Sequence, residues 1–565
     1  MSTAEGNGKP VDIGESASEA AGGGNPFFGF RREDVTATAG ALAKEIAAHP
    51  TLLLEQQAEL VREITRVLAG QSEIKPSPQD KRFSDAAWAQ NPFYRVFMGG
   101  YLAWSKALEE LVDKTTFDDL TKERGRFVAQ LITSALAPTN SLANPAVVKR
   151  ALETGGGSVV HGLQNMMSDL FTNSGMPTQV DKSAFEVGKN LATTAGSVVF
   201  RSDVLELIQY EPQTERVHQL PLLFIPPQIN KFYVFDLSPA NSLFDFLIKS
   251  GIQVFTISWR NPTAEQRDWC LDTYASAIVE AVAAVREICN VEKANVTGAC
   301  AGAVTLSALL GYYAAGGEKS PFNSATNLVS TLSIGTDSML GMFMAKDVLQ
   351  AAKDASARKG VLEGADLGRI FAWLRPNDLV WNYWVNNYLL GKDPPAFDIL
   401  YWNADTTRLP AKFHAEVMDL YGENKFLEPG GMTVLGRPVD LKQVSLDAYF
   451  VCGITDHIVP WKSVYASMMS FSGERTLVLS AAGHIQSLIN PPASAAKRQY
   501  LLNSNYVADP EAWLKDATPH KGTWWGHWLE WLQRRSGELV AAPAAVGSAN
   551  HPPLAAAPGS YVLAD

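Results

Sequence analysis

The apolar residues in the first third of the chain follow a helical spacing. Aromatic and aliphatic side chains in residues 93–108 recur every three or four positions, which is typical of an amphipathic helix. Asn144 followed by Pro145 has the composition of a helix start, and the glycine triplet at 155–157 is expected to end that helix. We therefore predict a mostly helical N-terminal domain over residues 25–199.

From about residue 200 the pattern changes to short apolar runs separated by helix-like stretches. The six runs that we expect to form strands are residues 221–225, 253–259, 294–297, 327–334, 446–452 and 475–480. Residues 268–288, between the second and third runs, have the composition of a helix. Buried strands that alternate with helices predict a mostly parallel sheet with helices on both faces, here over residues 200–540.

Four segments depart from this alternation. Residues 338–441 are rich in Trp and Tyr and are not strand-like, so we expect an insertion that covers one edge of the sheet as a cap. Residues 524–531 form a Trp-rich, helix-like closing element. Residues 1–24 offer little to bury, which predicts disorder. Residues 541–565 are rich in Ala, Pro and Gly, and we expect a loose tail there.

Composition narrows the classes of function. The chain has 565 residues, 46% of them hydrophobic and 19% charged, as expected of a globular protein with a large core. A formal net charge of −11 without basic runs speaks against a nucleic-acid partner. The uncharged stretch 294–317 could span a bilayer by length, but its polar residues and glycines favour a strand, a turn and a buried helix. We therefore expect no transmembrane segment, and the first 24 residues lack the apolar core of a secretory signal.

The chain contains four cysteines at wide spacing, which matches neither a zinc site nor a disulfide framework. This usage fits a reducing cytoplasm. We expect Cys270, Cys289 and Cys452 to act as small hydrophobic residues in the packing, because their neighbours are apolar. Cys300 stands in a different context.

Cys300 lies in the pattern G-x-C-x-G, formed by residues 298–302 between a strand-like and a helix-like stretch. This is the pattern of a nucleophile elbow with cysteine in place of serine. The start of the following helix favours the thiolate form of Cys300, and the amide of Ala301 is the expected oxyanion donor. The alternative is a buried structural cysteine at the start of a helix rich in small residues.

Candidate partners for this thiol follow in the order that an α/β-hydrolase fold requires, first an acid and then a histidine. Asp456 comes directly after the strand 446–452, and His484 directly after the last strand. We expect His484 to take the proton from Cys300, and Asp456 to hold the correct tautomer of the imidazole or to help deprotonate an incoming hydroxyl. Asp337 is the rival acid.

Two supporting residues complete the predicted site. His457 competes with His484 but adjoins the acid, so we expect it to be a supporting hydrogen-bond donor or a surface residue. The second oxyanion donor should come from the loop after the strand 221–225, and we assign it to the amide of Ile229.

At this point the sequence resembles the polyhydroxyalkanoate synthases, most closely the single-subunit class II type, over residues 25–531. The resemblance rests on five long strings at residues 226–237, 258–262, 381–389, 456–461 and 483–487. It implies a Cys-His-Asp set at Cys300, His484 and Asp456, and a mobile cap over the thiol. Two positions depart from the family pattern: Ala303 stands where a second glycine is usual, and Ser333 where aspartate is frequent.

The resemblance also implies the activity and its setting. The enzyme would polymerise 3-hydroxyacyl-CoA into polyhydroxyalkanoate polyester, releasing CoA, through a covalent cysteine thioester and without a cofactor or metal. The helical domain would serve dimerisation and attachment to cytoplasmic polyester granules, where granule-coat proteins are further expected partners. Two alternatives stay open from the residues alone. One is a cysteine-dependent thioesterase or hydrolase of the same fold, and the other is a non-catalytic granule-associated scaffold.

Overall fold

The computed structural model describes residues 40, 44, 50–78, 80–173, 175–334, 341 and 346–564. The described residues divide into two compact units. One contains the residues up to Asp181 together with Arg369–Pro395, and the other contains Lys182–Gly368 and Ala396–Asp565. The expected disorder of residues 1–24 and the rival acid Asp337 lie outside the described residues.

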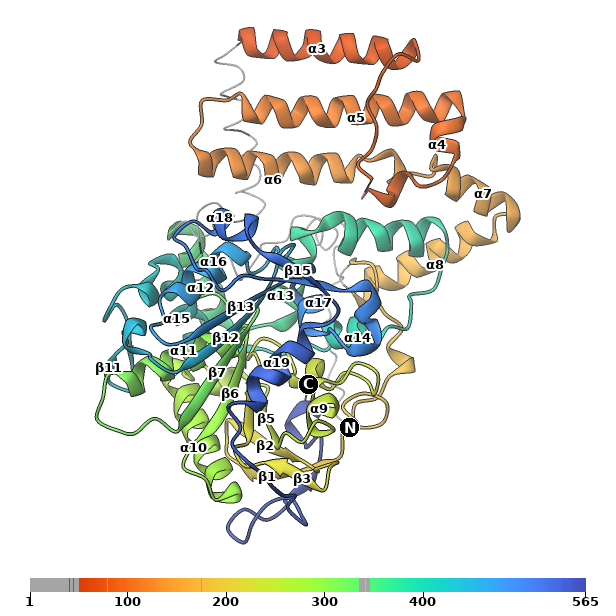
Figure 1. The fold of residues 1–565 in the computed structure, drawn as a ribbon. Helices are drawn as coiled ribbons and strands as arrows, with labels where there is room; N and C mark the ends of the chain where they lie inside the picture. Colours follow the sequence, from red (N-terminus) through yellow and green to blue (C-terminus); the bar gives the residue numbers. More distant parts are fainter. Residues whose placement is uncertain are drawn as a thin grey trace, which may run out of the picture. The chain divides into compact units, whose positions relative to one another are not determined.

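The first unit is helical, as the apolar spacing predicts. Figure 1 shows α3, α5 and α6 side by side in one layer, and α3 and α6 both pack against α5. Its main helices are α3 (Pro50–Leu68), α5 (Pro92–Asp113), α6 (Asp119–Ala135), α7 (Pro145–Glu153), α8 (Gly157–Thr172), η7 (Asn377–Trp381) and η8 (Trp384–Leu389).

Helix starts and ends in this unit follow from side-chain capping. The Asn91 side chain accepts a hydrogen bond from the Phe93 amide at 2.9 Å, and Asn144 accepts one from the Ala146 amide at 3.0 Å. Gly155 and Gly156 then adopt φ values of 57° and 87°, which side chains disfavour, so the chain turns between α7 and α8.

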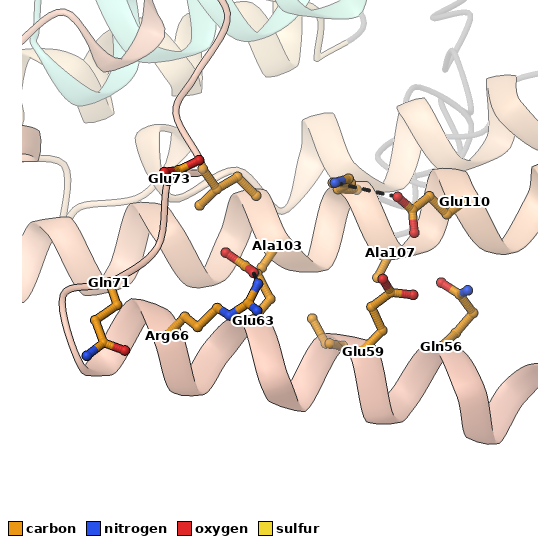
Figure 2. Close-up of a pocket in the computed structure, with 12 residues that line it drawn as sticks. Gln56, Glu59, Glu63, Arg66, Gln71, Glu73, Ala103, Ala107 and Glu110 are labelled. Atoms are coloured by element: carbon orange, nitrogen blue, oxygen red, sulfur yellow. Dashed lines mark hydrogen bonds and ion pairs between the residues drawn. The ribbon is translucent and has the colours of Figure 1, made fainter.

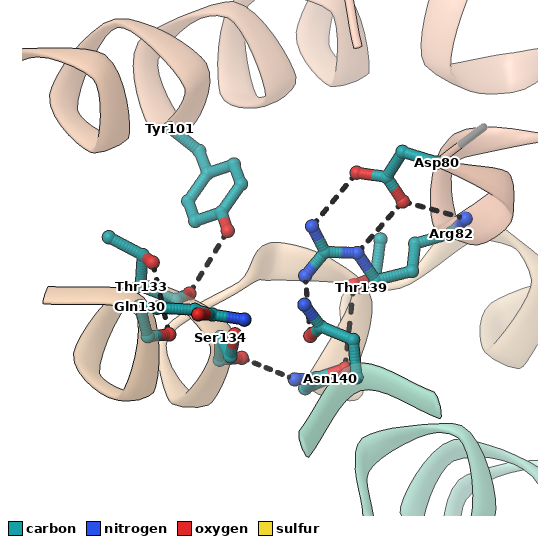
Figure 3. A network of polar contacts seen from close by, with 9 residues as sticks. Asp80, Arg82, Tyr101, Gln130, Thr133, Ser134, Thr139 and Asn140 are labelled. Carbon is teal, nitrogen blue, oxygen red and sulfur yellow. Dashed lines mark hydrogen bonds and ion pairs between the residues drawn. The ribbon is translucent and has the colours of Figure 1, made fainter. Parts of the chain in front are cut away.

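A polar network joins the helical layer to the segment Arg369–Pro395 (Figure 3). The Arg82 guanidinium donates to both carboxylate oxygens of Asp80, at 2.9 and 2.8 Å, and to Asn377 Oδ1 at 2.9 Å. Tyr101 Oη donates to the Thr133 carbonyl at 3.0 Å. This segment, which we expected in the cap, therefore belongs to the helical unit.

A groove of about 700 Å³ runs along α3 and α5 (Figure 2). Two of its acidic side chains are paired within the groove: Glu63 with Arg66 at 3.5 Å, and Glu110 with Lys106 at 3.6 Å. Exposed pairs of this kind contribute about 0–1 kcal/mol each. The groove is therefore a solvated polar contact between two helices.

The second unit contains an 11-stranded sheet in the order β15-β14-β13-β12-β7-β6-β4-β5-β2-β1-β17. The neighbours from β13 to β5 pair in parallel, and the strands on both flanks pair antiparallel. The bounds are β1 (Gly196–Arg201), β2 (Leu205–Tyr210), β4 (Leu222–Ile225), β5 (Val254–Trp259), β6 (Ala294–Ala299), β7 (Phe322–Leu328), β12 (Asp447–Gly453), β13 (Arg475–Ser480), β14 (Gln499–Leu502), β15 (Thr518–Lys521) and β17 (Ala555–Ala556).

The core of this unit lies between the central strands and aromatic helices. Every residue of β4, β5 and β6 is buried, as expected of parallel strands covered on both faces. The principal helices around the sheet are α9 (Leu243–Ile248), α10 (Leu271–Cys289), α11 (Ala301–Ala314), α16 (Trp461–Met469) and α19 (Trp524–Gln533). Trp528 of α19 packs edge-on against Phe224 of β4, with ring centroids 6.3 Å apart. The Trp-rich closing element is thus part of the core.

The structure differs from the expected strands at β7, which runs over Phe322–Leu328 rather than residues 327–334. Several buried side chains of this strand are polar, so the strand does not form the apolar run from which strands are predicted. Ser324 Oγ donates to Asn295 Oδ1 at 2.8 Å, and Thr326 Oγ1 accepts from Trp528 Nε1 at 2.9 Å. The strand ends before Val329, which has a positive φ of 42°.

Both ends of the expected domain layout also differ from the structure. The helical unit ends at Asp181, and β1 begins at Gly196, inside the stretch that we expected to be helical up to residue 199. Residues 541–565 are not a loose tail in their described part. β17 pairs with β1, and Val562 is buried in the core. Within the described ranges, every helix is too short or too polar to traverse a bilayer.

Candidate active site

Cys300 occupies a sharp bend between β6, which ends at Ala299, and α11, which begins at Ala301. Its backbone has φ 46° and ψ −121°. A positive φ is costly for a residue with a side chain, and such strain is concentrated at functional sites. The bend presents the partly exposed cysteine at the carboxyl end of a central strand.

The two glycines of the pattern are there because backbone approaches too closely for side chains. A Cβ atom on Gly302 would lie 2.5 Å from the Pro226 carbonyl oxygen and would also collide with that of Ile225. A Cβ atom on Gly298 would lie 2.5 Å from the Cα atom of Ala303. The elbow is therefore packed tightly against the loop that follows β4.

Hydrogen bonds fix the backbone of Cys300 from both sides. Its amide donates to the Leu328 carbonyl at 2.9 Å. Its carbonyl accepts from Ser330 Oγ at 2.9 Å and from the amide of Ala303 at 3.0 Å. The backbone of Cys300 is thus held by the end of β7, by Ser330 just after it, and by the first turn of α11.

His484 and Asp456 form a buried pair next to this cysteine. His484 Nδ1 donates to Asp456 Oδ2 at 2.7 Å, with 8% of the imidazole and none of the carboxylate exposed. Asp456 Oδ1 accepts from the amides of Ile458 and Val459, each at 2.9 Å. Both carboxylate oxygens are therefore used, and the imidazole is held with Nε2 left for the thiol.

The surroundings of His484 change its acidity strongly. Burial by itself lowers the pKa of His484, but the charge and hydrogen bond of Asp456 outweigh it. A hydrogen bond with the Cys300 side chain and the charge of that group raise the pKa further, to about 10. The structure thus brings together Cys300, His484 and Asp456 from three separate strand ends.

The two expected oxyanion donors lie on the elements that meet at the elbow. Ala301 is the first residue of α11, so its amide is not used by the hydrogen bonds of the helix. Ile229 lies in the loop after β4, next to Gln228, whose Nε2 donates to Thr305 Oγ1 of α11 at 3.1 Å. The loop is therefore fixed to the first turns of the nucleophile helix.

The other candidate residues from the sequence analysis are not part of the group formed by Cys300, His484 and Asp456. His457 is partly buried in the turn after β12, but the carboxylate of its neighbour Asp456 is bonded to His484. Cys452 is buried, and burial followed by the charge of Asp456 raises the pKa of its thiol. Burial raises the pKa of Cys289 to about 12.

One neighbour of the thiol was missed by sequence reasoning. Tyr421 is on α15 (Ala411–Gly422), and its Oη donates to the Thr331 carbonyl at 3.0 Å. Burial, and then the charge of Cys300, raise the pKa of Tyr421. Because it stands in a long insertion without a motif, only the folded structure reveals that it lies near Cys300.

Comparison with known proteins decides the family. A family model described as "Poly-beta-hydroxybutyrate polymerase (PhaC) N-terminus" matches residues 79–247, and one described as "alpha/beta hydrolase fold" matches residues 221–491. The "Poly(3-hydroxyalkanoate) polymerase 1" of Ectopseudomonas oleovorans is 48% identical over 98% of this chain and 98% of its own length. The chain belongs to the poly(3-hydroxyalkanoate) polymerase family.

Two further polymerases agree with this assignment. "Poly(3-hydroxyalkanoate) polymerase 2" of Ectopseudomonas oleovorans is 48% identical, covering 95% of this chain and 96% of the relative. A polymerase subunit of Cupriavidus necator is 40% identical, covering 88% of this chain and 85% of the relative. This polymerase thus has the expected α/β-hydrolase fold with an N-terminal helical region, and Cys300, Asp456 and His484 all lie within the hydrolase-fold match.

Proposed function

We propose that this polymerase converts 3-hydroxyacyl-CoA into polyester with release of CoA, through an acyl thioester on Cys300. The observation that carries the proposal is the contact of His484 with both Asp456 and Cys300 at the elbow. A raised pKa of His484 favours acceptance of a proton by its imidazole, as the proposed deprotonation of Cys300 requires.

In the first step, the Cys300 thiolate attacks the carbonyl carbon of the substrate thioester. The tetrahedral intermediate places its negative oxygen toward the amides of Ala301 and the loop after β4. The bond to the CoA sulfur then breaks, and His484 gives its proton to the leaving thiolate. One thioester replaces another, so the step is close to thermoneutral and the acyl group stays activated.

In the second step, a hydroxyl group of a 3-hydroxyacyl chain attacks the acyl thioester on Cys300. Neutral His484 accepts the hydroxyl proton while the new ester bond forms and the thiolate of Cys300 leaves. Asp456 keeps Nδ1 of the imidazole protonated throughout, so that Nε2 faces the reacting atoms. These steps use side chains and amides alone, and we propose that the reaction needs no metal or other cofactor.

We further propose that the helical unit serves dimerisation and attachment to the polyester granule in the cytoplasm, where granule-coat proteins are the expected neighbours. Support comes from α8, on which Val160, Leu163 and Phe171 are each more than half exposed. Apolar side chains gathered on one helix are unusual on a surface that faces only water.

The test is to incubate the purified protein with 3-hydroxyacyl-CoA substrates of three to twelve carbons, to measure CoA release, and to analyse the product. We expect insoluble polyester. Free hydroxy acid would indicate a thioesterase instead, and absence of CoA release would indicate a scaffold. Cys300→Ala removes the nucleophile and should abolish CoA release while leaving the melting temperature close to wild type. Wild-type CoA release from Cys300→Ala would refute the mechanism.

A further inference from the structure

A segment of the long insertion contacts the loop after β4 on the side of the loop that faces away from α11. This segment, residues 402–407, comprises the C-terminal end of α14 (Asp398–Ala404) and the residues that follow it. It contacts the loop residues 228–231 with an ion pair, side-chain hydrogen bonds and a β-bridge. Both partners belong to the same compact unit.

The centre of this contact is a largely buried ion pair. Lys231 Nζ lies 2.7 Å from Asp405 Oδ1, with 6% of the lysine and 19% of the aspartate side chain exposed. The second oxygen, Oδ2, accepts a hydrogen bond of 2.7 Å from Tyr233 Oη. Removal of either charge leaves the other poorly solvated, which is costly in a protein interior.

Three further contacts hold the loop backbone. Trp402 Nε1 donates to the Lys231 carbonyl at 2.7 Å, and Thr407 Oγ1 donates to the Gln228 carbonyl at 3.0 Å. Asn230 forms an antiparallel bridge with Thr406. The residues on either side of Ile229 are therefore fixed by the insertion.

The inner side of the loop faces the nucleophile helix. Gln228 Nε2 bonds to Thr305 of α11, and the Pro226 carbonyl accepts from Trp259 Nε1 at 2.8 Å. The loop thus lies between α11 and residues 402–407. A small displacement at its outer side would move whichever amide faces the oxyanion.

We infer that Asp405 is a positioning residue for the oxyanion site, which acts by holding Lys231 and Tyr233 and thereby the loop between β4 and η4 (Phe232–Phe235). This inference rests on the proposed function, because it assigns an oxyanion donor to that loop. Oxyanion donors act over a narrow range of distance, and a displacement of about 1 Å costs about 100-fold in rate. Asp405 then affects the rate of acyl transfer without contacting the substrate.

The test separates the oxyanion site from the nucleophile. Asp405→Asn preserves the shape and an oxygen that Tyr233 can bond, but it removes the charge opposite Lys231. We expect single-turnover CoA release to slow about 10- to 100-fold. Alkylation of Cys300 by iodoacetamide needs the thiolate but no oxyanion donor, so its rate should stay within about twofold of wild type.

Two further variants distinguish a specific effect on the loop after β4 from a general loss of stability. Tyr233→Phe leaves no charge unpaired, so it keeps the test available if Asp405→Asn folds poorly, and it should reduce acylation by a smaller factor with unchanged alkylation. Arg201→Met breaks the ion pair of Arg201 with buried Glu206 elsewhere in the same unit, and it should lower the melting temperature without changing either rate.

The inference is overturned if Asp405→Asn acylates at the wild-type rate, or if acylation and alkylation slow by equal factors. The second result would mean that the whole site is deformed. Failure of the proposed function gives a different result, since Cys300→Ala would then still release CoA.

Discussion

The raised pKa of His484 predicts that the folded protein loses stability as the pH rises. Its pKa is raised from an ordinary value of 6.5 to about 10 in the folded protein, so folding binds a proton. The resulting stabilisation is complete below pH 6.5 and is lost as the pH rises toward 10. Its size is on the order of a few kcal/mol. Thermal unfolding measured from pH 6 to pH 10 should show a steeper loss of stability for wild type than for His484→Gln. Parallel curves for the two proteins would contradict this account.

The two candidate histidines should differ in their effect on acylation. His484 bonds to Asp456, and its pKa responds to Cys300, whereas His457 is the residue that follows Asp456 in the chain. We predict that His484→Gln slows single-turnover CoA release by at least about 100-fold, the usual share of a general acid–base group. His457→Gln should cost less than about tenfold. Equal losses in the two variants, measured on proteins with matched melting temperatures, would overturn the ranking.

The elbow depends on the absence of one side chain. In Gly302→Ala the new Cβ atom would meet the backbone of Ile225 and Pro226, which cannot move without displacing β4 and its loop. We predict a loss of about 1–3 kcal/mol in unfolding free energy, together with slower CoA release. The matched control is Gly526→Ala in α19, where nothing lies within 4 Å of the new atom, and which should be neutral or slightly stabilising. Thermal unfolding and CoA release are measured for both variants. Similar melting temperatures for the two would contradict the prediction, because they would mean that a side chain fits at residue 302.

Elements whose signal is local could be predicted from the sequence. The strand before Asp456 is an apolar run, the stretch before Cys300 is short and uncharged, and the elbow is a five-residue pattern, so all three follow from neighbouring residues. The sequence predicts the strand β7 at residues 327–334, but its true start at Phe322 could not be predicted, because Ser324 and Thr326 are satisfied by partners distant in sequence. Tyr421 and Asp405 carry no local signal either, because only the folded insertion brings them to the site.

At the scale of the whole molecule, residues 555–562 close the edge of the sheet. β17 pairs with β1, and a buried carboxylate fixes the segment: Glu206 accepts from the amides of Ser560 and Tyr561, each at 2.9 Å. Glu206 is fully buried, and Arg201 Nε donates to it at 2.9 Å. The composition of this segment gave no sign of its contacts with β1 and Glu206, because the shortest of them, between Glu206 and Ser560, spans 354 positions.

Deletion of residues 543–565 should therefore destabilise the protein rather than remove a passive tail. It leaves the β1 edge unpaired and takes from the Glu206 carboxylate every described partner except Arg201. We expect a cost of a few kcal/mol and a tendency to aggregate through the open edge. Glu206→Gln in the full chain should lower stability in the same direction. Glu474→Gln is the matched control, because Glu474 is two-thirds exposed in its pair with Arg535 and should change stability by less than about 0.5 kcal/mol. Thermal unfolding with light scattering measures both effects, and an unchanged midpoint after the deletion would mean that the segment contributes nothing to the fold.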